Sequence, residues 1–368
     1  MSGATRTPTG IASYGHYVPM LRMEMGVLAE QWGLGETLER VYRLNGRSMV
    51  AVNGLDEDTV TLSIEAAERA MARLPASVAR PASVLIGSES HPYAVKPSGV
   101  VVAEALGLAP DVFVADLEFA CKGGTAALYL SLGMVESGRL PAALAIGADC
   151  PQSAPGSLLE ASVGAGASAF VVARGGDGPG GGELVATIDT IAAASSDATD
   201  FWRRDGEPFP SVVGKFSAEV GYAEHTRRVV ECLLRETGTS PGDYRYLCLH
   251  QPYPSLPLSV ARELGFKRPQ VQPGIVAGKI GNTYSSACLL GLCNVLDQAS
   301  AGDRIMLVSF GSGAGSDGFV MTVTPAIEAY RARGAELRME PVARQVEGEH
   351  ADWLTYGQYL LTQGKLRS

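Results

Sequence analysis

The sequence of 368 residues lacks an apolar run long enough to cross a membrane, and its N-terminus has no signal-peptide pattern. We therefore expect a cytoplasmic protein that does not act in a membrane. Basic residues are also scarce, with 30 Lys and Arg against 39 Asp and Glu, which gives a formal net charge of −9. This balance argues against a general nucleic-acid binder. A phosphate-bearing ligand would need a local basic cluster.

The cysteines form no C-x-x-C pair, so the sequence indicates neither a zinc site nor a disulfide framework. We expect no metal and no bound cofactor. The six cysteines are Cys121, Cys150, Cys232, Cys248, Cys288 and Cys293. What the chain does have is 46% hydrophobic residues and 44 glycines, a composition typical of a compact globular protein with many tight turns.

Hydrophobic patterns predict alternating strands and helices, and therefore an α/β fold with a largely parallel sheet covered on both faces. Predicted strands are Gly10–Tyr14, Ser83–Gly87, Val112–Phe119, Ala142–Gly147, Gly164–Ala173, Glu183–Ile191, Tyr244–Leu249, Arg304–Phe310 and Gly318–Thr324. Predicted helices are Met23–Trp32, Asp56–Leu74, Ser98–Leu106, Thr125–Glu136, Ala218–Thr237, Leu256–Leu264, Ser285–Gln298 and Trp353–Leu361.

A local repeat indicates that the chain is duplicated. The run Gly164–Phe170 resembles Gly313–Phe319, 149 residues later, and the order of strands and helices agrees around both. We therefore predict an N-terminal half over residues 1–175, a similar C-terminal half over 176–325, and a tail over 326–368 that packs on the surface.

The most informative stretch surrounds Cys121, which lies between a predicted buried strand and a predicted helix. At such a corner, free backbone N–H groups and the helix dipole stabilise a thiolate and can hold an oxyanion. Gly123 and Gly124 cost helix stability, and they fit a turn that a ligand or another backbone approaches closely. The alternative is a buried structural cysteine.

Three polar residues follow or flank predicted strands in a way that brings them toward Cys121. They are Glu89, His250 and Asn282. Ligands bind at the carboxyl ends of strands in α/β sheets. Singly, these residues fit a loop acid, a core histidine and a helix cap. Together with Cys121 they supply a nucleophile, an acid/base, an orienting amide and a second base.

Five ordered motifs carry a resemblance to a known family. They are GSESHPY (Gly87–Tyr93), EFACK (Glu118–Lys122), HQP (His250–Pro252), GNTYS (Gly281–Ser285) and FGSGAGSD (Phe310–Asp317). The chain resembles the hydroxymethylglutaryl-CoA synthase family, especially its archaeal-type branch within the thiolase superfamily. The resemblance covers about residues 10–325. It implies a thiolase-like fold, in which two duplicated α/β halves form a five-layer αβαβα arrangement, and a homodimer.

The resemblance also implies the chemistry. Cys121 would accept an acetyl group from acetyl-CoA, Glu89 would remove a proton from the acetyl methyl, and His250 would act as acid/base beside the ketone of acetoacetyl-CoA. Implied substrate contacts are Asn282, Tyr284, Ser162, Ser217, Lys215 for CoA, and backbone N–H groups near Cys121 and Ser312. Trp202, Arg203 and Arg204 with Lys215 fit a phosphate-binding cluster, or exposed salt-bridge partners.

The chain departs from the family after the HQP motif, where Tyr253, Ser255 and Ser259 replace the usual Asn, Lys and Arg. The acceptor's CoA would then be held differently, or the acceptor is a carrier-protein thioester or another ketone. Two alternatives remain: an acyltransferase or ketosynthase-like subunit working with a thiolase-like subunit and a small zinc-containing protein, and a non-catalytic subunit of such a complex. Glu89 favours condensation, since simple acyl transfer does not require that base.

Overall fold

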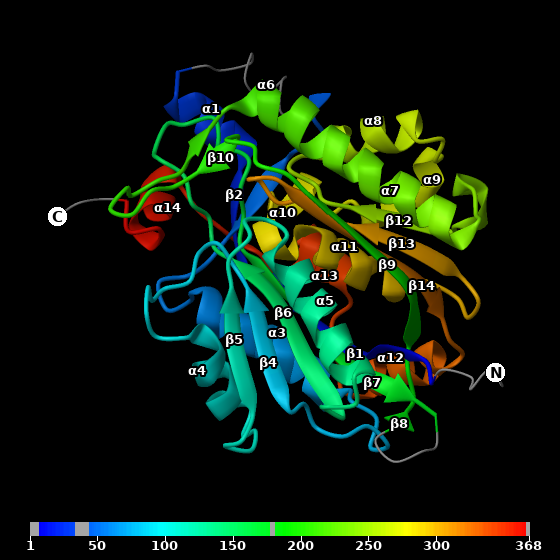
Figure 1. Ribbon diagram of the computed structural model, residues 1–368. Coiled ribbons are helices and arrows are strands. Elements are labelled where there is room, and N and C mark those ends of the chain that lie inside the picture. Colours follow the sequence, from blue (N-terminus) through cyan, green and yellow to red (C-terminus); the bar gives the residue numbers. More distant parts are fainter. Residues whose placement is uncertain (1–6, 34–43, 177–180, 366–368) are drawn as a thin grey trace.

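The computed structural model describes residues 7–33, 44–176 and 181–365 (Figure 1). The first strands are β1 (Thr9–Tyr17), β2 (Leu21–Glu24), β3 (Met49–Val52), β4 (Ser83–Gly87), β5 (Phe113–Leu117), β6 (Ala142–Asp149), β7 (Gly166–Gly175) and β8 (Gly181–Gly182). Between them lie the helices α1 (Met25–Gln31), α3 (Thr59–Ala72), α4 (Ser98–Ala105) and α5 (Gly123–Glu136).

Later strands are β9 (Ala186–Ser195), β10 (Phe201–Trp202), β11 (Ser211–Val212), β12 (Tyr246–Leu249), β13 (Arg304–Val308), β14 (Gly315–Val323) and β15 (Asp352–Trp353). The α-helices are α6 (Gly214–Phe216), α7 (Glu224–Thr237), α8 (Ser255–Glu263), α9 (Arg268–Val271), α10 (Ala277–Ile280), α11 (Ala287–Leu296), α12 (Ala326–Glu336), α13 (Val342–Glu347) and α14 (Tyr356–Thr362). A π-helix (Ser217–Ala223) precedes α7, and short 3₁₀ turns span Pro241–Asp243, Gln272–Gly274 and Tyr284–Ser286. No helix in the described ranges is long and apolar enough to cross a membrane.

Ten strands form one large mixed sheet in the order β12-β13-β14-β9-β1-β7-β6-β4-β5, with β8 beside β7, while β10-β11 and β15-β2-β3 form two small sheets. Only β12–β13, β6–β4, β4–β5 and β7–β8 pair in parallel; the other neighbours are antiparallel. The prediction of a largely parallel sheet is therefore wrong. The physical reason is that β6 and β7, like β13 and β14, are joined without a crossover helix, so the chain returns antiparallel.

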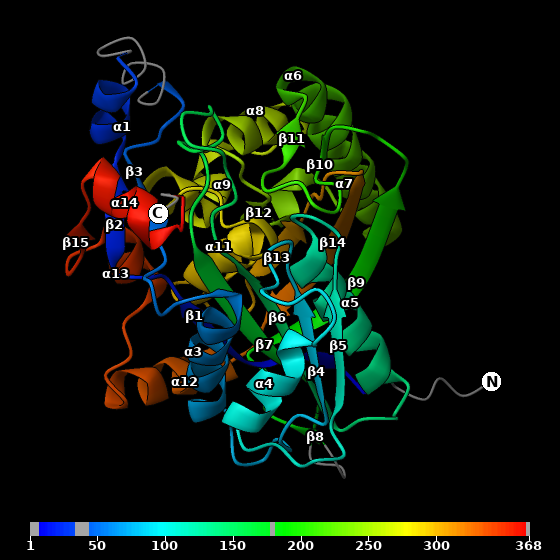
Figure 2. The same ribbon diagram turned by 90° about the vertical axis from the view of Figure 1, so that its left-hand side faces the viewer.

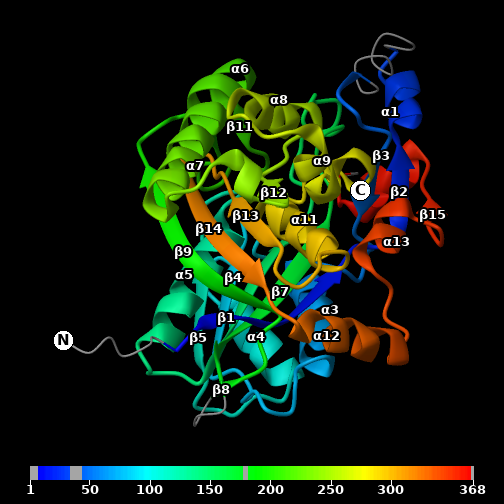
Figure 3. The ribbon, with the colours of Figure 1, turned by 90° about the vertical axis from the view of Figure 1, so that its right-hand side faces the viewer.

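Helices divide the structure into five layers. On one side α3 and α4 cover β1, β4, β6 and β7, and on the opposite side α7 and α8 cover β9 and β12 to β14 (Figure 3). Helices α5 and α11 lie in the middle, where they form the largest apolar cluster with both parts of the sheet. The predicted five-layer αβαβα fold is confirmed, and helix α11 is buried along its whole length because sheet covers it on both sides.

The duplication is visible in the strand order. Counting outward from the junction of β1 and β9, one half runs β1-β7-β6-β4 and the other β9-β14-β13-β12, so corresponding strands take corresponding places. The repeated runs Gly164–Phe170 and Gly313–Phe319 lead into the equivalent strands β7 and β14. The residue boundaries of the halves and the tail stay a prediction.

Two local predictions are wrong. Strand β5 is not buried: it is the edge strand of the sheet, and Phe113 is 51% exposed. The tail does not simply pack on the surface, because Tyr330, Val342 and Tyr359 are buried and the first two join the main core. Figure 2 shows α14 beside β2 and α1 at one side of the molecule.

Candidate active site

Cys121 lies in the short connection between β5 and α5. The preceding residue, Ala120, has φ +41°, a left-handed conformation that costs energy for a residue with a side chain. A Cβ on Gly87 would come within 1.8 Å of the backbone of Gly123, and one on Gly124 within 2.6 Å of the Ser285 carbonyl oxygen. The glycines of this turn therefore admit neighbouring backbone, one of the two predicted reasons for them.

The thiol of Cys121 donates a hydrogen bond to Glu89 Oε1 at 3.1 Å. Glu89 directly follows β4 in the turn after Ser88, as the sequence predicts for a residue at a strand end. Burial of the carboxyl group and the nearby charge of Asp149 raise the pKa of Glu89 to about 8. Its carboxyl group can therefore both accept and return a proton near neutral pH.

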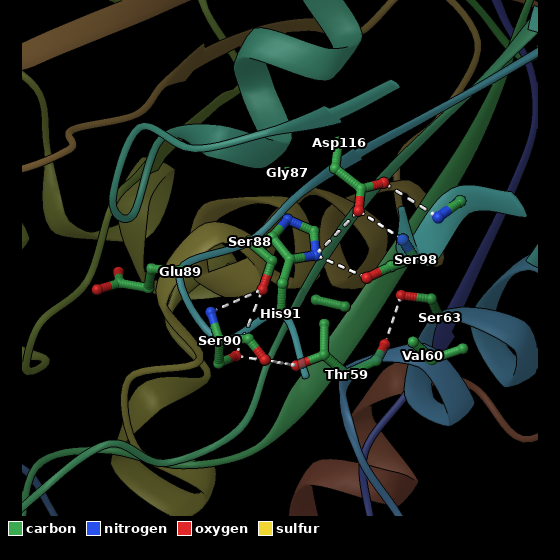
Figure 4. A network of polar contacts seen from close by, with 12 residues as sticks. Thr59, Val60, Ser63, Gly87, Ser88, Glu89, Ser90, His91, Ser98 and Asp116 are labelled. Atoms are coloured by element: carbon green, nitrogen blue, oxygen red, sulfur yellow. Dashed lines mark hydrogen bonds and ion pairs between the residues drawn. The ribbon is translucent and has the colours of Figure 1, made fainter. Parts of the chain in front are cut away.

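Polar contacts behind Glu89 fix its backbone. Asp149 Oδ1 accepts hydrogen bonds from the Glu89 N–H at 2.9 Å, from Ser88 Oγ at 2.7 Å and from Ser90 Oγ at 2.6 Å. Figure 4 shows that Ser88, Ser90 and the neighbouring His91 take part in a network with Thr59, Ser98 and Asp116, while the Glu89 carboxylate points away from it. The network therefore holds the turn and leaves the carboxylate to Cys121.

The pKa of the Cys121 thiol is raised, first by burial and then by the charge of Glu89. A hydrogen bond with Asn282 lowers this pKa but does not outweigh the other two causes. The prediction of a thiolate stabilised at the start of the helix is therefore wrong. The sulfur is largely buried, and the carboxyl group of Glu89 lies in contact with it. Both causes favour the thiol over the thiolate, and the thiol has a proton acceptor in contact.

A cavity of about 390 Å³ opens at Cys121. Most of its lining is apolar, and its polar lining includes the sequence-predicted residues Ser162, Ser217, His250, Asn282, Tyr284 and Ser312. The fold thus gathers seven predicted residues around one space, and Glu89 contacts the sulfur from behind. Lys215 is the exception, because its side chain is 87% exposed and lies 3.8 Å from Glu219. Its contact with CoA stays a prediction.

His250 follows β12 and is almost fully buried in the wall of this cavity. Burial lowers the pKa of His250 to about 3, so the imidazole is neutral at physiological pH. Its Nδ1 atom has no hydrogen-bond partner within the part of the chain that the structure describes. The backbone of His250 is held by Tyr222, whose hydroxyl donates to the His250 carbonyl at 2.6 Å. A neutral imidazole has one N–H and one acceptor nitrogen, so the ring can either donate to or accept from a ligand in the cavity.

Sequence reasoning missed three residues that shape the site. Asp149 ends β6, so the rule of polar groups at strand ends would have found it. Gln152 supports both sides of the site, since its side chain donates to the Glu89 carbonyl and its N–H donates to Tyr284 Oη at 2.9 Å. Arg47 lines the cavity and donates to Ser162 Oγ at 2.8 Å, but nothing in its sequence context signals this.

Arg47 also packs against Tyr253, one of the positions at which the sequence departs from the pattern it resembles. Its guanidinium lies 5.1 Å from the centre of the Tyr253 ring, and it also donates to the Pro252 carbonyl at 3.3 Å. A cation from the segment before β3 is thus packed on the loop that leads into α8.

Comparisons with known proteins agree with the geometry. The profile of 3-Oxoacyl-[acyl-carrier-protein (ACP)] synthase III C terminal matches residues 234–323. Among curated proteins, the hydroxymethylglutaryl-CoA synthase of Methanosarcina acetivorans is 43% identical over 362 residues, which cover 97% of this chain and 99% of the relative. That of Methanopyrus kandleri is 42% identical over 361 residues, covering 97% and 98%.

Solved structures support the same fold. A crystal structure of HMG-CoA synthase complexed with CoA superposes with a TM-score of 0.82, at 23% identity, over 96% of this chain and 89% of the other. The HMG synthase of the curacin biosynthetic pathway, in complex with a holo donor-ACP, also gives 0.82 at 23% identity, over 96% and 88%. At the level of sequence, the archaeal relatives match nearly from end to end, and the chain belongs to the hydroxymethylglutaryl-CoA synthase family of condensing enzymes.

Proposed function

We propose that this protein transfers an acetyl group from acetyl-CoA to Cys121 and then joins it to acetoacetyl-CoA or a related β-keto thioester. The observation that carries the proposal is the 3.1 Å contact between Cys121 Sγ and Glu89 Oε1 beside a cavity that His250 lines. A structural cysteine has no need of a half-buried carboxyl group in contact with its sulfur and of a cavity in front of it.

In the first step, the sulfur of Cys121 attacks the carbonyl carbon of acetyl-CoA. The thiol proton passes to Glu89, the bond from the acetyl carbon to the CoA sulfur breaks, and the CoA thiolate takes up that proton. The raised pKa of Cys121 fits this order, because attack is coupled to proton transfer and no standing thiolate is required. Backbone N–H groups near Cys121 and Ser312 are the proposed donors to the oxyanion.

In the second step, Glu89 removes a proton from the methyl group of acetyl-Cys121, and the resulting enolate carbon bonds to the ketone carbon of the acceptor. The neutral N–H of His250 donates a hydrogen bond to the ketone oxygen as negative charge develops there. That oxygen takes the proton that Glu89 carries. Water then cleaves the bond to Cys121, which frees the product and restores the thiol.

The residues after the HQP motif bear on the identity of the acceptor. Neutral Tyr253, Ser255 and Ser259 favour an acceptor whose thioester is not held by basic residues of α8, such as a carrier-protein thioester. A solved neighbour with this fold is in complex with a donor-ACP, so its carrier protein bears on the acetyl donor and leaves the acceptor open. Against that, Arg47 supplies a cation at the same loop, which favours a CoA thioester.

Further partners and the location of the protein stay predictions. The free edge of β5, with exposed Phe113 and nearby exposed Val100 and Leu130, favours the predicted homodimer, because an apolar sheet edge invites pairing with a second copy. The larger complex with a thiolase-like subunit and a small zinc-containing protein, and the cytoplasmic location, rest on the resemblance and on the sequence alone.

The test is intact-mass spectrometry followed by a condensation assay. We expect the wild-type protein to gain the mass of one acetyl group from acetyl-CoA, and Cys121→Ala to gain none. The acetylated protein is then offered acetoacetyl-CoA or a carrier-bound acetoacetyl group, and the faster acceptor is the preferred one. An unmodified wild-type protein would overturn the proposal in favour of a non-catalytic subunit. Acetylation without condensation on either acceptor would favour a plain acyltransferase.

A further inference from the structure

We infer that the buried ion pair between Glu160 and Lys365 positions one wall of the active site, which makes the C-terminal segment part of the catalytic machinery. The inference rests on the proposed function and concerns the wall loop, defined as residues 150–165 between β6 and β7. Neither residue touches the cavity, so both are positioning residues and not catalytic ones.

The wall loop reaches the reacting groups at both ends. Near its start, Gln152 hydrogen-bonds to the backbone carbonyl of Glu89 and to the hydroxyl of Tyr284. Near its end, Leu158, Leu159 and Ser162 line the cavity. A displacement of this loop would therefore move both Gln152, which holds the backbone of Glu89, and the residues that line the cavity.

The loop has little regular structure of its own. Between β6 and β7 the chain forms turns, and its internal backbone hydrogen bonds include those from Ser157 to Ala154 and from Glu160 to Ser157, each a single turn. Short turns of this kind do not by themselves fix a loop of this length. Contacts from elsewhere in the fold must hold it.

The C-terminal segment supplies those contacts through Lys365. Its ammonium group lies 3.2 Å from Glu160 Oε1 and donates to Ser153 Oγ at 3.0 Å and to Tyr359 Oη at 2.7 Å. These three acceptors match the three N–H donors of an ammonium group. The side chains of Lys365 and Glu160 are only 3% and 0% exposed, so the pair is shielded from water and salt.

Glu160 is satisfied on its other oxygen as well. Its Oε2 accepts from the Gly156 N–H at 2.9 Å and from the Tyr356 hydroxyl at 3.0 Å. Tyr356 and Tyr359 both belong to α14, so helix and ammonium bind the loop from one side. Ala161 and Tyr359 are also buried in one apolar cluster with residues of α1, β2 and β3. The tail thus fastens the loop at Ser153 and Glu160.

Breaking the pair from one side has a clear physical consequence. Loss of the Lys365 charge leaves the Glu160 carboxylate buried without its counter-ion, and a buried charge without a partner is strongly unfavourable. The loop relieves this cost by turning Glu160 toward water. Because small displacements of positioning groups lower the rate of a reaction sharply, condensation slows although no reacting residue has changed.

The experiment uses Lys365→Met, which keeps the length of the side chain without its charge. We expect kcat for condensation to fall ~10-fold or more, with a smaller change in KM. Hydrogen exchange of residues 150–165 should rise, while that of strand β6 stays unchanged. The matched control is Lys279→Met, which breaks the exposed pair with Glu347, whose side chain is 54% exposed, and should change neither readout.

A double variant, Glu160→Gln with Lys365→Met, keeps the test valid if the single variant does not fold. It leaves no buried charge but still lacks the ammonium donor, so the same rise in exchange and a smaller loss of kcat are expected. Hydrogen exchange of residues 150–165 that is unchanged in the variants overturns the inference. Faster exchange with an unchanged kcat also overturns it, as does a loss of kcat in Lys279→Met equal to that in Lys365→Met. A wild-type protein that is not acetylated at all contradicts the proposed function instead, and exchange still reports on the loop.

Discussion

Replacing Glu89 by Gln should make the protein more stable and less active, and the stability gain should grow with pH. The reason is that the fold raises the pKa of Glu89 from its ordinary value of 4.5 to about 8. An acid with a raised pKa binds its proton more tightly in the folded state than in the unfolded state. The stability from this protonation is complete below about pH 4.5 and is lost as pH rises toward 8. Gln cannot ionise, so the variant escapes this loss.

The size of the effect follows from the shift. The stability difference grows by about 2.5 pKa units between pH 5.5 and pH 8, and at ~1.4 kcal/mol per unit this gives a ceiling of about 3.5 kcal/mol. The side chain of Glu89 is only partly buried, so solvent screening reduces this ceiling. We expect the free energy of unfolding of the variant, relative to wild type, to increase by about 1 to 2 kcal/mol across that pH interval.

Urea unfolding at the two pH values measures the effect directly. The control is Glu219→Gln, an exposed carboxylate whose side chain is 67% accessible, for which no such growth with pH is expected. Condensation by Glu89→Gln should fall ~10²-fold or more, the scale of a lost acid/base group. Acetyl-Cys121 should still form, but more slowly, because Gln cannot take the thiol proton that Glu89 accepts in the first step. A difference in unfolding free energy that stays flat between pH 5.5 and pH 8 would refute the electrostatic reasoning, and unchanged condensation would refute the role of Glu89 as base.

Two more predictions concern the same site and its backbone. Burial lowers the pKa of His250 to about 3, so the rate of condensation should not change with pH near 6.5, the ordinary pKa of histidine. His250→Asn should slow condensation ~10²-fold while sparing acetylation of Cys121. A change in rate near pH 6.5 that is present in wild type and absent in the variant would contradict this. Gly87→Ala places a Cβ 1.8 Å from the backbone of Gly123, so thermal unfolding should show a loss of at least about 3 kcal/mol or no folded protein. Gly133→Ala, on the exposed face of α5 with nothing within 4 Å, should gain about 0.5 to 1 kcal/mol. Equal stability of the two alanine variants would show that the close approach at Gly87 does not matter.

Much of the fold could be predicted because hydrophobic periodicity reports burial directly. Strand β4 has the predicted bounds Ser83–Gly87, and α5 and α7 end where predicted, at Glu136 and Thr237. The prediction of strand direction is wrong because the overall alternation of strands and helices does not by itself mean a parallel sheet. No helix is predicted between residues 147 and 164 or between 310 and 318, and these are the connections at which the chain returns antiparallel. The exposure of β5 was out of reach, since the apolar run Val112–Leu117 is the same whether the strand lies at the centre of a sheet or at its edge.

The sequence by itself determined which reactive groups are present and roughly where each one lies along the chain. Cys121, Glu89, His250 and Asn282 stand at the ends of predictable elements, and local patterns are enough to place such ends. The tertiary structure alone decided their chemical state, because a pKa depends on burial and on neighbours distant in sequence. Asp149 raises the pKa of Glu89 from 60 residues away, and Lys365 reaches the wall loop from the far end of the chain. No local pattern encodes such contacts, since they exist only after the layers have packed together.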